Sequence, residues 1–237
     1  MIKLIKKKLR NFLYRNNHCT NFFSQGGEDA ILYGIFNKKT KKGERGFYVD
    51  IGAYHPYIHS NTYRFYINGW RGINIDACPG SMDLFNKLRP RDINLEIGIG
   101  DPENAPTFYM LDEKSTMNSF SKENLILHGV DQFIKKELNL KVTSLEQVFN
   151  NYSNYFTKID FMSIDVEGMD YEVLKTNNWD KYKPSVIVVE LNCSDVEDLN
   201  ENESSQYLFD LGYKIIAKNV IMKNLASVFF VLNEYEY

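Results

Sequence analysis

Apolar runs separated by polar or amphipathic stretches recur along this chain. The first begins at Phe47 and ends at an acidic residue and a glycine, Asp50 and Gly52. Six more lie at residues 72–76, 93–101, 159–166, 185–192, 213–217 and 227–232. Runs with little polar alternation are typical of strands covered on both faces, as in a parallel sheet. The amphipathic stretches between them predict helices, so the pattern predicts an α/β fold whose last two strands pair antiparallel at one edge.

Three segments lie outside this alternation. Residues 1–23 combine lysines with apolar positions at helical spacing and predict a basic amphipathic helix. Residues 37–44 are rich in lysine and predict a charged surface loop. Residues 102–141 are polar and irregular and predict an insertion or lid over the sheet edge. The chain therefore predicts one domain over residues 24–237, which carries that insertion.

Acidic residues end four of the predicted strands: Asp50, Asp76, Asp165 and Glu190. The carboxyl ends of parallel strands lie along one edge of a sheet, where α/β folds place their ligand crevices. Any single acid of this kind could instead cap a helix or lie on the surface. Four acids at equivalent positions favour a shared crevice.

Composition narrows the range of partners. The chain has 28 Lys and Arg against 31 Asp and Glu, a formal net charge of −3, so nucleic acid is not an expected partner. Its three cysteines, Cys19, Cys78 and Cys193, are far apart and odd in number, which disfavours a disulfide framework or a structural zinc site. No window reaches the roughly 18 apolar residues of a membrane span, and the basic N-terminus lacks a signal-peptide core. We therefore expect a cytoplasmic protein.

The turn after the first strand limits the choice of cofactor. A dinucleotide site needs G-x-G-x-x-G, whereas residues 50–56 contain one glycine, and the chain has no Walker-type phosphate loop. Asp76, some two dozen residues further on, is placed to accept hydrogen bonds from a ribose diol. A cofactor with a ribose and an adenine but no phosphates fits both features, and S-adenosylmethionine is such a molecule.

Six stretches together resemble the FkbM family of S-adenosylmethionine-dependent methyltransferases. They are SQGGED (24–29), FYVDIGA (47–53), SNT (60–62), GWRGINID (69–76), IDFMSIDVEG (159–168) and VVELN (188–192). The resemblance implies a class I methyltransferase fold, which is Rossmann-like: a seven-stranded, mostly parallel sheet with an antiparallel last strand and helices on both faces. It also implies O-methylation of a sugar hydroxyl, in a nucleotide-sugar or in a capsular or surface polysaccharide precursor.

The same resemblance implies which residues bind the cofactor. Asp50 and Gly52 would form the turn around the methionine part, and Asp76 would hold the ribose hydroxyls. Asn61, with Ser60 and Gln25, would reach the amino-acid end of the cofactor. The backbone of Ile97 and Gly98 would flank the adenine.

A metal ion is expected because an alcohol attacks a methyl group poorly until it loses its proton or its oxygen binds a metal. Asp165, Glu190 and Asn192 supply hard oxygen ligands at neighbouring strand ends, which suits Mg²⁺ or Mn²⁺. The alternative is that these side chains only hydrogen-bond sugar hydroxyls.

The general base is left open by the resemblance. Many family members have a histidine where this chain has Met169. The catalytic candidates are therefore Asp165, Glu167 and His55, with His59 as a further one.

Two other kinds of function stay open. The chain could be a non-catalytic binding or assembly protein on a Rossmann-like scaffold, or a methyltransferase for a small amine or carboxylate. The basic N-terminal helix could bring the protein close to a membrane or support a homo-oligomer.

Overall fold

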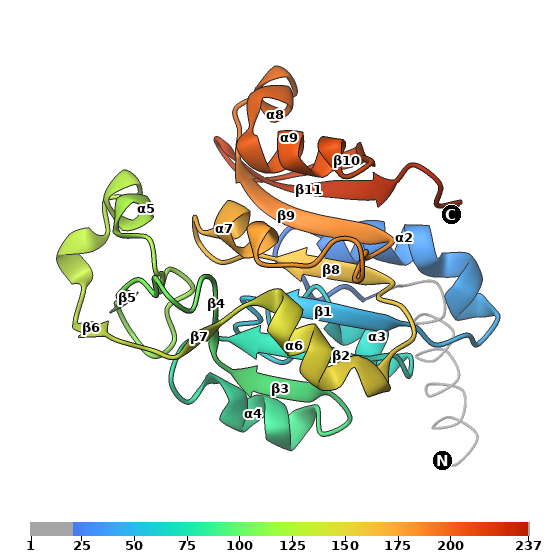
Figure 1. Cartoon of the computed structure of the whole chain (residues 1–237), viewed down its shortest axis with the longest axis horizontal. Coiled ribbons are helices and arrows are strands. Elements are labelled where there is room, and N and C mark those ends of the chain that lie inside the picture. Colours follow the sequence, from blue (N-terminus) through green and yellow to red (C-terminus); the bar gives the residue numbers. More distant parts are fainter. Residues whose placement is uncertain (1–20, 237) are drawn as a thin grey trace, which may run out of the picture.

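The computed structural model describes residues 21–236, and its centre is a seven-stranded sheet in the order β10-β11-β9-β8-β1-β2-β3 (Figure 1). These strands are β1 Phe47–Ile51, β2 Arg71–Asp76, β3 Ile93–Glu96, β8 Phe161–Ile164, β9 Val186–Asn192, β10 Tyr213–Met222 and β11 Leu225–Leu232. β1 pairs in parallel with β2 and β8, β2 with β3, and β8 with β9. β11 is antiparallel to both of its neighbours. The expected mostly parallel sheet with an antiparallel last strand is confirmed.

The predicted antiparallel pairing of the last two strands at one edge of the sheet is confirmed. Within this pair β11 lies between β9 and β10, so β10 forms the outer edge. Residues 226–231 of β11 are all buried, whereas most residues of β10 are only partly buried. A strand that is apolar on both faces is most stable with neighbours on both sides, and the more polar β10 tolerates the edge.

Helices cover both faces of the sheet (Figure 1). On one face α6 Leu145–Tyr152, α7 Asp170–Lys175 and α9 Glu203–Asp210 pack against a core that includes Val49 and Ile51. On the other face α2 Glu28–Lys41 and α3 Tyr63–Ile67 pack against Tyr48 and its neighbours. The alternation of side chains along β1 sends Val49 and Ile51 to one core and Tyr48 to the other. The remaining helices beside the sheet are α4 Ser81–Leu88, η2 Ser153–Tyr155 and α8 Glu197–Glu201.

Two of the predicted boundaries are wrong. The surface loop expected at residues 37–44 is helical as far as Lys41, because three lysines in the last turn of α2 interact favourably with the helix dipole. The strand expected at residues 93–101 is broken after Glu96. Its continuation, β4 Gly98–Ile99, leaves the main sheet and pairs with β7 Val142–Thr143.

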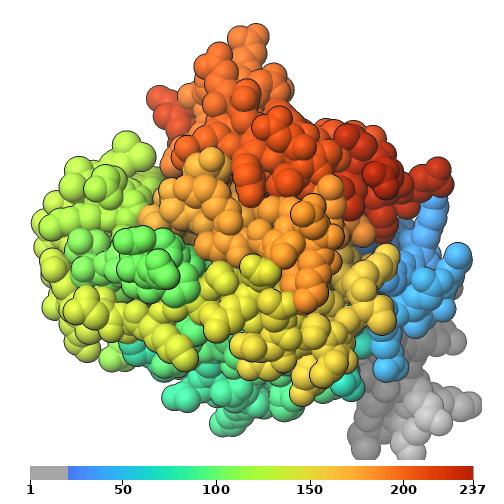
Figure 2. Space-filling view, in the orientation of Figure 1, coloured from blue at the N-terminus to red at the C-terminus, as the bar shows by residue number. Residues whose placement is uncertain are grey.

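Between β4 and β7 the chain forms a lobe beside the main sheet. Its strands β5 Phe108–Met110 and β6 Lys136–Leu138 pair antiparallel, and α5 Lys122–Leu127 and η1 Asp131–Phe133 lie between them. Figure 2 shows this lobe in green to yellow-green beside the orange residues that follow β8. The lobe stands next to the carboxyl ends of the central strands, where the crevice opens.

Three further expectations concern the ends of the chain, membranes and cysteines. The helix predicted at residues 1–23 falls almost wholly outside the residues that the structure describes. Among residues 21–236 no helix has both the length and the apolar character that a bilayer crossing requires. Cys78 and Cys193 are buried and free, so neither of them forms a disulfide bond.

Candidate active site

A crevice with two adjoining chambers lies at the carboxyl ends of the central strands. The first chamber lies between the ends of β1, β2 and β8 and the 102–141 lobe. The second chamber lies toward the start of α2 and the β10–β11 hairpin. Five residues line both chambers: Gly52, Tyr54, Thr116, Asp165 and Glu167.

Gly52 holds the turn after β1 tightly between two other strands. Its φ of +80° is in the left-handed region, and a Cβ at this position would overlap the carbonyl oxygen of Asp165. Its N–H donates a hydrogen bond to the carbonyl of Ile75, at 2.9 Å. Because only glycine fits here, the backbone comes close to β8 and leaves room for a ligand over the strand ends.

Asp76 is held at the side of the first chamber by the backbone. Its carboxylate accepts hydrogen bonds from the N–H groups of Tyr54 and Cys78, both at 2.8 Å. Burial raises the pKa of Asp76, and these two bonds oppose that rise. Ile97 and Gly98 line the same chamber, and a Cβ at Gly98 would meet the Phe120 ring at 2.8 Å. One side of the chamber thus carries the fixed carboxylate of Asp76, and another is formed by the backbone at Gly98 and the ring of Phe120.

The second chamber receives amide side chains and a buried glutamate. Gln25 and Asn61 line it, and Asn61 Nδ2 donates to Ser163 Oγ at 2.9 Å. Glu28 lies at its base with 2% of its surface exposed and accepts hydrogen bonds from Asn219 and Ser227. Glu28 was not expected to contribute to the crevice. Its place in the 24–29 motif was the one available signal, since the sequence alone suggested only an acid in the first turn of a helix.

Three carboxylates form an acid cluster between the chambers: Asp165, Glu167 and Glu190. One oxygen atom from each lies within 4.8 Å of the others, and all three residues are partly buried. Burial and the neighbouring acids raise the pKa of Glu167 to about 8 and that of Glu190 to about 10. The pKa of Asp165 also rises, chiefly through burial, while its hydrogen bond with Glu190 opposes the rise. These carboxylates attract either protons or a cation.

No lysine or arginine among the described residues lines either chamber. The first chamber adds Asp76 and Glu113 to the acids of the cluster, and the second adds Glu28. The crevice therefore has a negative potential with no protein cation to balance it.

The comparisons with known proteins bear directly on this crevice. Residues 50–215 match the model of the methyltransferase FkbM domain, which is more than half of the chain. The chain belongs to the FkbM methyltransferase family. It is thus a methyltransferase of the type that depends on S-adenosylmethionine, and the crevice occupies the edge of the sheet at which this fold binds its cofactor. None of the curated proteins compared with the chain matches it.

Two of the solved structures that match this chain are described as methyltransferases. A putative type 11 methyltransferase from Sulfolobus solfataricus is 10% identical, with 90% of this chain and 96% of that chain covered and a TM-score of 0.43. An O-methyltransferase from Bacillus cereus in complex with SAH is 10% identical, with 93% and 96% covered and a TM-score of 0.40. The family assignment rests on the domain match.

Two residues expected to bind the cofactor lie outside the crevice of this FkbM methyltransferase. Asp50 is 5% exposed, and its carboxylate accepts a hydrogen bond from Thr62 Oγ1 at 2.7 Å. Ser60 is 1% exposed, and its Oγ accepts hydrogen bonds from the N–H groups of Thr62 and Tyr63. Neither lines a chamber. Both support the loop that carries Asn61, so they can affect the ligand only through that loop.

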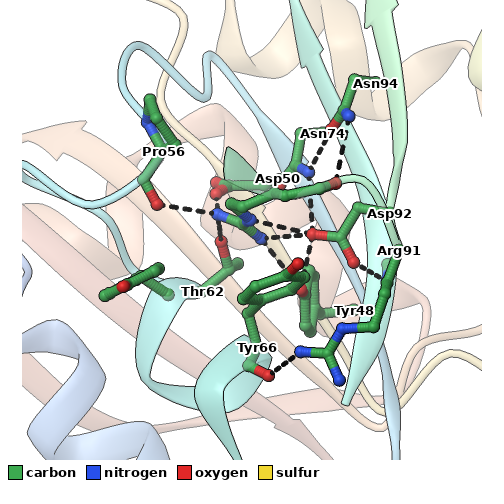
Figure 3. A network of polar contacts seen from close by, with 12 residues as sticks. Tyr48, Asp50, Pro56, Thr62, Tyr66, Asn74, Arg91, Asp92 and Asn94 are labelled. Atoms are coloured by element: carbon green, nitrogen blue, oxygen red, sulfur yellow. Dashed lines mark hydrogen bonds and ion pairs between the residues drawn. The ribbon is translucent and has the colours of Figure 1, made fainter. Parts of the chain in front are cut away.

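Asp50 belongs to a network of buried side chains that we call the arginine network (Figure 3), whose other members are Tyr48, Thr62, Arg89 and Asp92. Ser60 Oγ lies 3.5 Å from Arg89 at its border. Arg89 forms an ion pair with Asp92 at 2.8 Å and donates hydrogen bonds to Thr62 Oγ1 at 3.0 Å and to Tyr48 Oη at 2.8 Å. Tyr48 Oη donates in turn to Asp92. The network ties the end of β1 to the loop before α3 and to the segment between α4 and β3. No motif or spacing in the sequence indicates a role for Arg89.

One catalytic candidate and one expected metal ligand also lie outside the crevice. His55 lines neither chamber, and its Nδ1 accepts N–H groups from Tyr57 and Ile58 within its own turn. Asn192 is exposed and also lines neither chamber. It lies two residues beyond Glu190, about 6–7 Å further along the strand, and so past the edge of the crevice. Glu167 takes the place expected for Asn192 in the acid cluster.

Two other histidines do reach the second chamber, His59 and His128. Tyr54, His59 and Glu167 line that chamber with φ values of 52°, 53° and 55°, which non-glycine residues adopt rarely. Such backbone strain concentrates at functional sites. His59 lines the chamber whereas His55 does not, and no pattern in the sequence indicates this difference.

The 102–141 lobe contacts the acid cluster directly. Ser119 Oγ donates a hydrogen bond to the carbonyl of Glu167 at 2.8 Å, and Asn124 Nδ2 approaches its carboxylate at 3.5 Å. A Cβ at Gly168 would meet Asn124 at 2.9 Å. The lobe therefore helps to fix the strained turn that carries Glu167.

Proposed function

We propose that this FkbM methyltransferase transfers the methyl group of S-adenosylmethionine to a hydroxyl of a neutral sugar, with the acid cluster beside the reacting atoms. The observation that carries the proposal is the group of three carboxylates at the junction of the chambers, whose lining within residues 21–236 includes no lysine or arginine. The positive sulfonium of the cofactor complements this charge. In this arrangement the first chamber holds the adenosine part through Asp76, and the second holds the acceptor.

The charge of the crevice also supports a choice among acceptors. A diphosphate or a carboxylate would meet several acids in the chambers and no lysine or arginine from the part of the chain that the structure describes, which disfavours a nucleotide-sugar and a small acid. Neutral sugar hydroxyls can donate hydrogen bonds to the carboxylates instead. A small amine is the second candidate, because the same acids would attract its positive charge.

The transfer itself needs an acceptor for one proton. The sugar oxygen forms a bond to the methyl carbon while the carbon–sulfur bond breaks, and S-adenosylhomocysteine leaves with that electron pair. The hydroxyl proton passes to a carboxylate, and we assign this role to Glu167, because it lines both chambers and because burial and the neighbouring acids raise its pKa. Ser119 and Asn124 hold the turn that carries this residue.

A divalent cation fits the acid cluster, because its donors are hard oxygen atoms within reach of one another. Asp165 and Glu190 would hold Mg²⁺ or Mn²⁺, with water and acceptor hydroxyls completing the shell. Such an ion, when bound, would lower the pKa of the acceptor hydroxyl. It would also offset the repulsion among the carboxylates.

The test is an acceptor screen by mass spectrometry with S-adenosylmethionine as the donor, run beside a thermal-shift titration with S-adenosylhomocysteine. We expect stabilisation by S-adenosylhomocysteine but not by NAD, since a ligand that binds only the folded state at about 100 times its Kd adds roughly 2.7 kcal/mol. We also expect one methyl group to be added to a neutral glycoside. Turnover of amines and of no sugar would establish the second candidate. The absence of any stabilisation would indicate a non-catalytic protein.

A further inference from the structure

A second charged site, which we call the basic groove, lies at the opposite end of the sheet from the crevice. Its cations are Lys39, Arg45, Arg71 and Lys158, and its volume is about 500 Å³. The groove shares no lining residue with either chamber of the crevice. The proposed methyl-transfer site therefore does not explain why these cations lie together.

The four cations come from four separate segments that meet at the amino ends of the strands. Lys39 is in the last turn of α2, Arg45 precedes β1, and Arg71 is the first residue of β2. Lys158 comes from the loop before β8. Parallel pairing of β1 with β2 and β8 brings these segments together. The fold, and not a local run of lysines, thus creates the cluster.

One acid partly balances the groove, and it lies beneath it. Asp160 is 1% exposed and forms ion pairs with Lys39 at 2.6 Å and with Lys158 at 3.4 Å. No described residue forms a hydrogen bond or an ion pair with the guanidinium of Arg45 or Arg71, and both residues are exposed. Of the residues that the structure describes, no Asp or Glu lines the groove itself. Two guanidinium groups are therefore available to an external anion, in a chain whose net charge is −3.

We infer that the basic groove binds a phosphate group, either free or in a lipid headgroup. Paired guanidinium groups recognise phosphate through parallel charge-assisted hydrogen bonds, and two flanking lysines add charge. Placing four cations together costs repulsion that a bound anion removes. Tyr155, 66% exposed, lines the groove and offers an aromatic surface next to the cations. The acid-lined crevice would repel the same ligand, so the two ends of the sheet sort ligands by charge.

The experiment uses the full chain and two probes. Pyrophosphate is titrated by calorimetry, and sedimentation measures binding to phosphatidylcholine vesicles with and without phosphatidylglycerol. We expect one or both probes to bind, with pyrophosphate reporting free phosphate and the anionic vesicles reporting a lipid headgroup. The double variant Arg45→Ala/Arg71→Ala should weaken binding by at least about tenfold. Both substituted residues are exposed, and thermal melts will confirm that the variant is folded.

A matched variant, Lys87→Ala/Lys214→Ala, removes the same charge at exposed positions away from the groove and should leave binding unchanged. Binding of neither probe would overturn the inference. Equal losses in the two double variants would also overturn it, because net charge alone would then account for binding. Affinity for S-adenosylhomocysteine should be the same in all three proteins, which keeps this test separate from that of methyl transfer.

Discussion

Two groups of acids stand at the ends of neighbouring strands, and their surroundings differ. In the arginine network, Asp50 is 5% exposed, receives a hydrogen bond from Thr62, and has Arg89 as its neighbouring cation. In the acid cluster, Asp165 follows β8 and has two further carboxylates as neighbours. Burial raises the pKa in both places. The neighbours of Asp50 mostly oppose that rise, whereas the acids around Glu190 add to it.

The contrast separates a structural role from a chemical one. Buried charges that are paired and hydrogen-bonded hold a fold in one arrangement, as the arginine network holds the loop that carries Asn61. Acids with no neighbouring lysine or arginine have raised pKa values, and they bind a proton, a metal ion or a cationic ligand more readily. The position of an acid at a strand end does not distinguish the two roles. The two roles are distinguished by whether an arginine lies close to the acid.

The largest effect on activity should come from Asp165→Asn, which removes charge from the cluster and changes shape little. Turnover should fall by about 1,000-fold, since both the cation and the reacting hydroxyl lose a carboxylate partner. The affinity for S-adenosylhomocysteine, measured by calorimetry, should change by less than about threefold. Asp101→Asn, at an exposed acid outside both chambers, is the control. Normal turnover by the Asp165 variant would show that the cluster is not the reacting site.

The largest effect on stability should come from Arg89→Met. It leaves Asp50 and Asp92 buried without their cation, which typically costs about 3–5 kcal/mol. Urea unfolding followed by circular dichroism measures the loss. Arg91→Met removes an exposed arginine that donates to the Tyr66 carbonyl, and should cost about 1 kcal/mol. Similar losses in the two variants would mean that the arginine network is not what holds this region.

A smaller effect should follow from Asp76→Ala. The variant loses the carboxylate that we assign to the ribose hydroxyls, so affinity for S-adenosylhomocysteine should fall by about 10- to 100-fold. Glu113→Ala removes another acid from the first chamber and serves as the matched control, with a smaller loss expected. If the two variants lost affinity equally, general charge in the chamber would explain binding, and Asp76 would have no particular role.

The smallest effect concerns the dependence of stability on pH. The folded carboxyl of Glu167 keeps its proton up to about pH 8, while the unfolded carboxyl releases it near 4.5. The folded state binds more protons in this window, so the free energy of unfolding should decrease as the pH rises through it. Thermal melts in EDTA should show a lower Tm at about pH 8.5 than at about pH 6.

The contrast between the acid cluster and the arginine network predicts which substitution makes stability less dependent on pH. Glu190→Gln takes one carboxylate out of the cluster and should flatten the pH profile, and Glu137→Gln, at an exposed position in β6, should leave it unchanged. A profile that is the same in all three proteins would place the titrating groups outside the acid cluster.

Much of the fold could be predicted from the sequence, because strand periodicity is local and strong. The mostly parallel sheet and the acids at the ends of its strands follow from that pattern. The order of β10 and β11 depends on how completely each strand is buried, which is decided by packing across the sheet. The break after Glu96 depends on β7, more than forty residues later in the chain.

The candidate site could be predicted only in part. The sequence placed Asp76, Asp165 and Glu190 at one edge, and the structure brings them to one crevice. It could not show that Asp50 and Arg89 share Thr62 as a hydrogen-bond partner, since that arrangement depends on where α4 ends. Nor could it distinguish His55 from His59: Nδ1 of His55 accepts N–H groups within its own turn, whereas His59, whose φ is 53°, lines the second chamber.

The most direct test of the account is a titration of Mn²⁺ into the protein in the presence of S-adenosylhomocysteine, followed by electron paramagnetic resonance. The account predicts one saturable site that is lost in Asp165→Asn/Glu190→Gln and kept in Asp101→Asn/Glu137→Gln. The absence of saturable binding, or equal binding by the two double variants, would contradict the claim that the unbalanced carboxylates form a cation site next to the reacting methyl group.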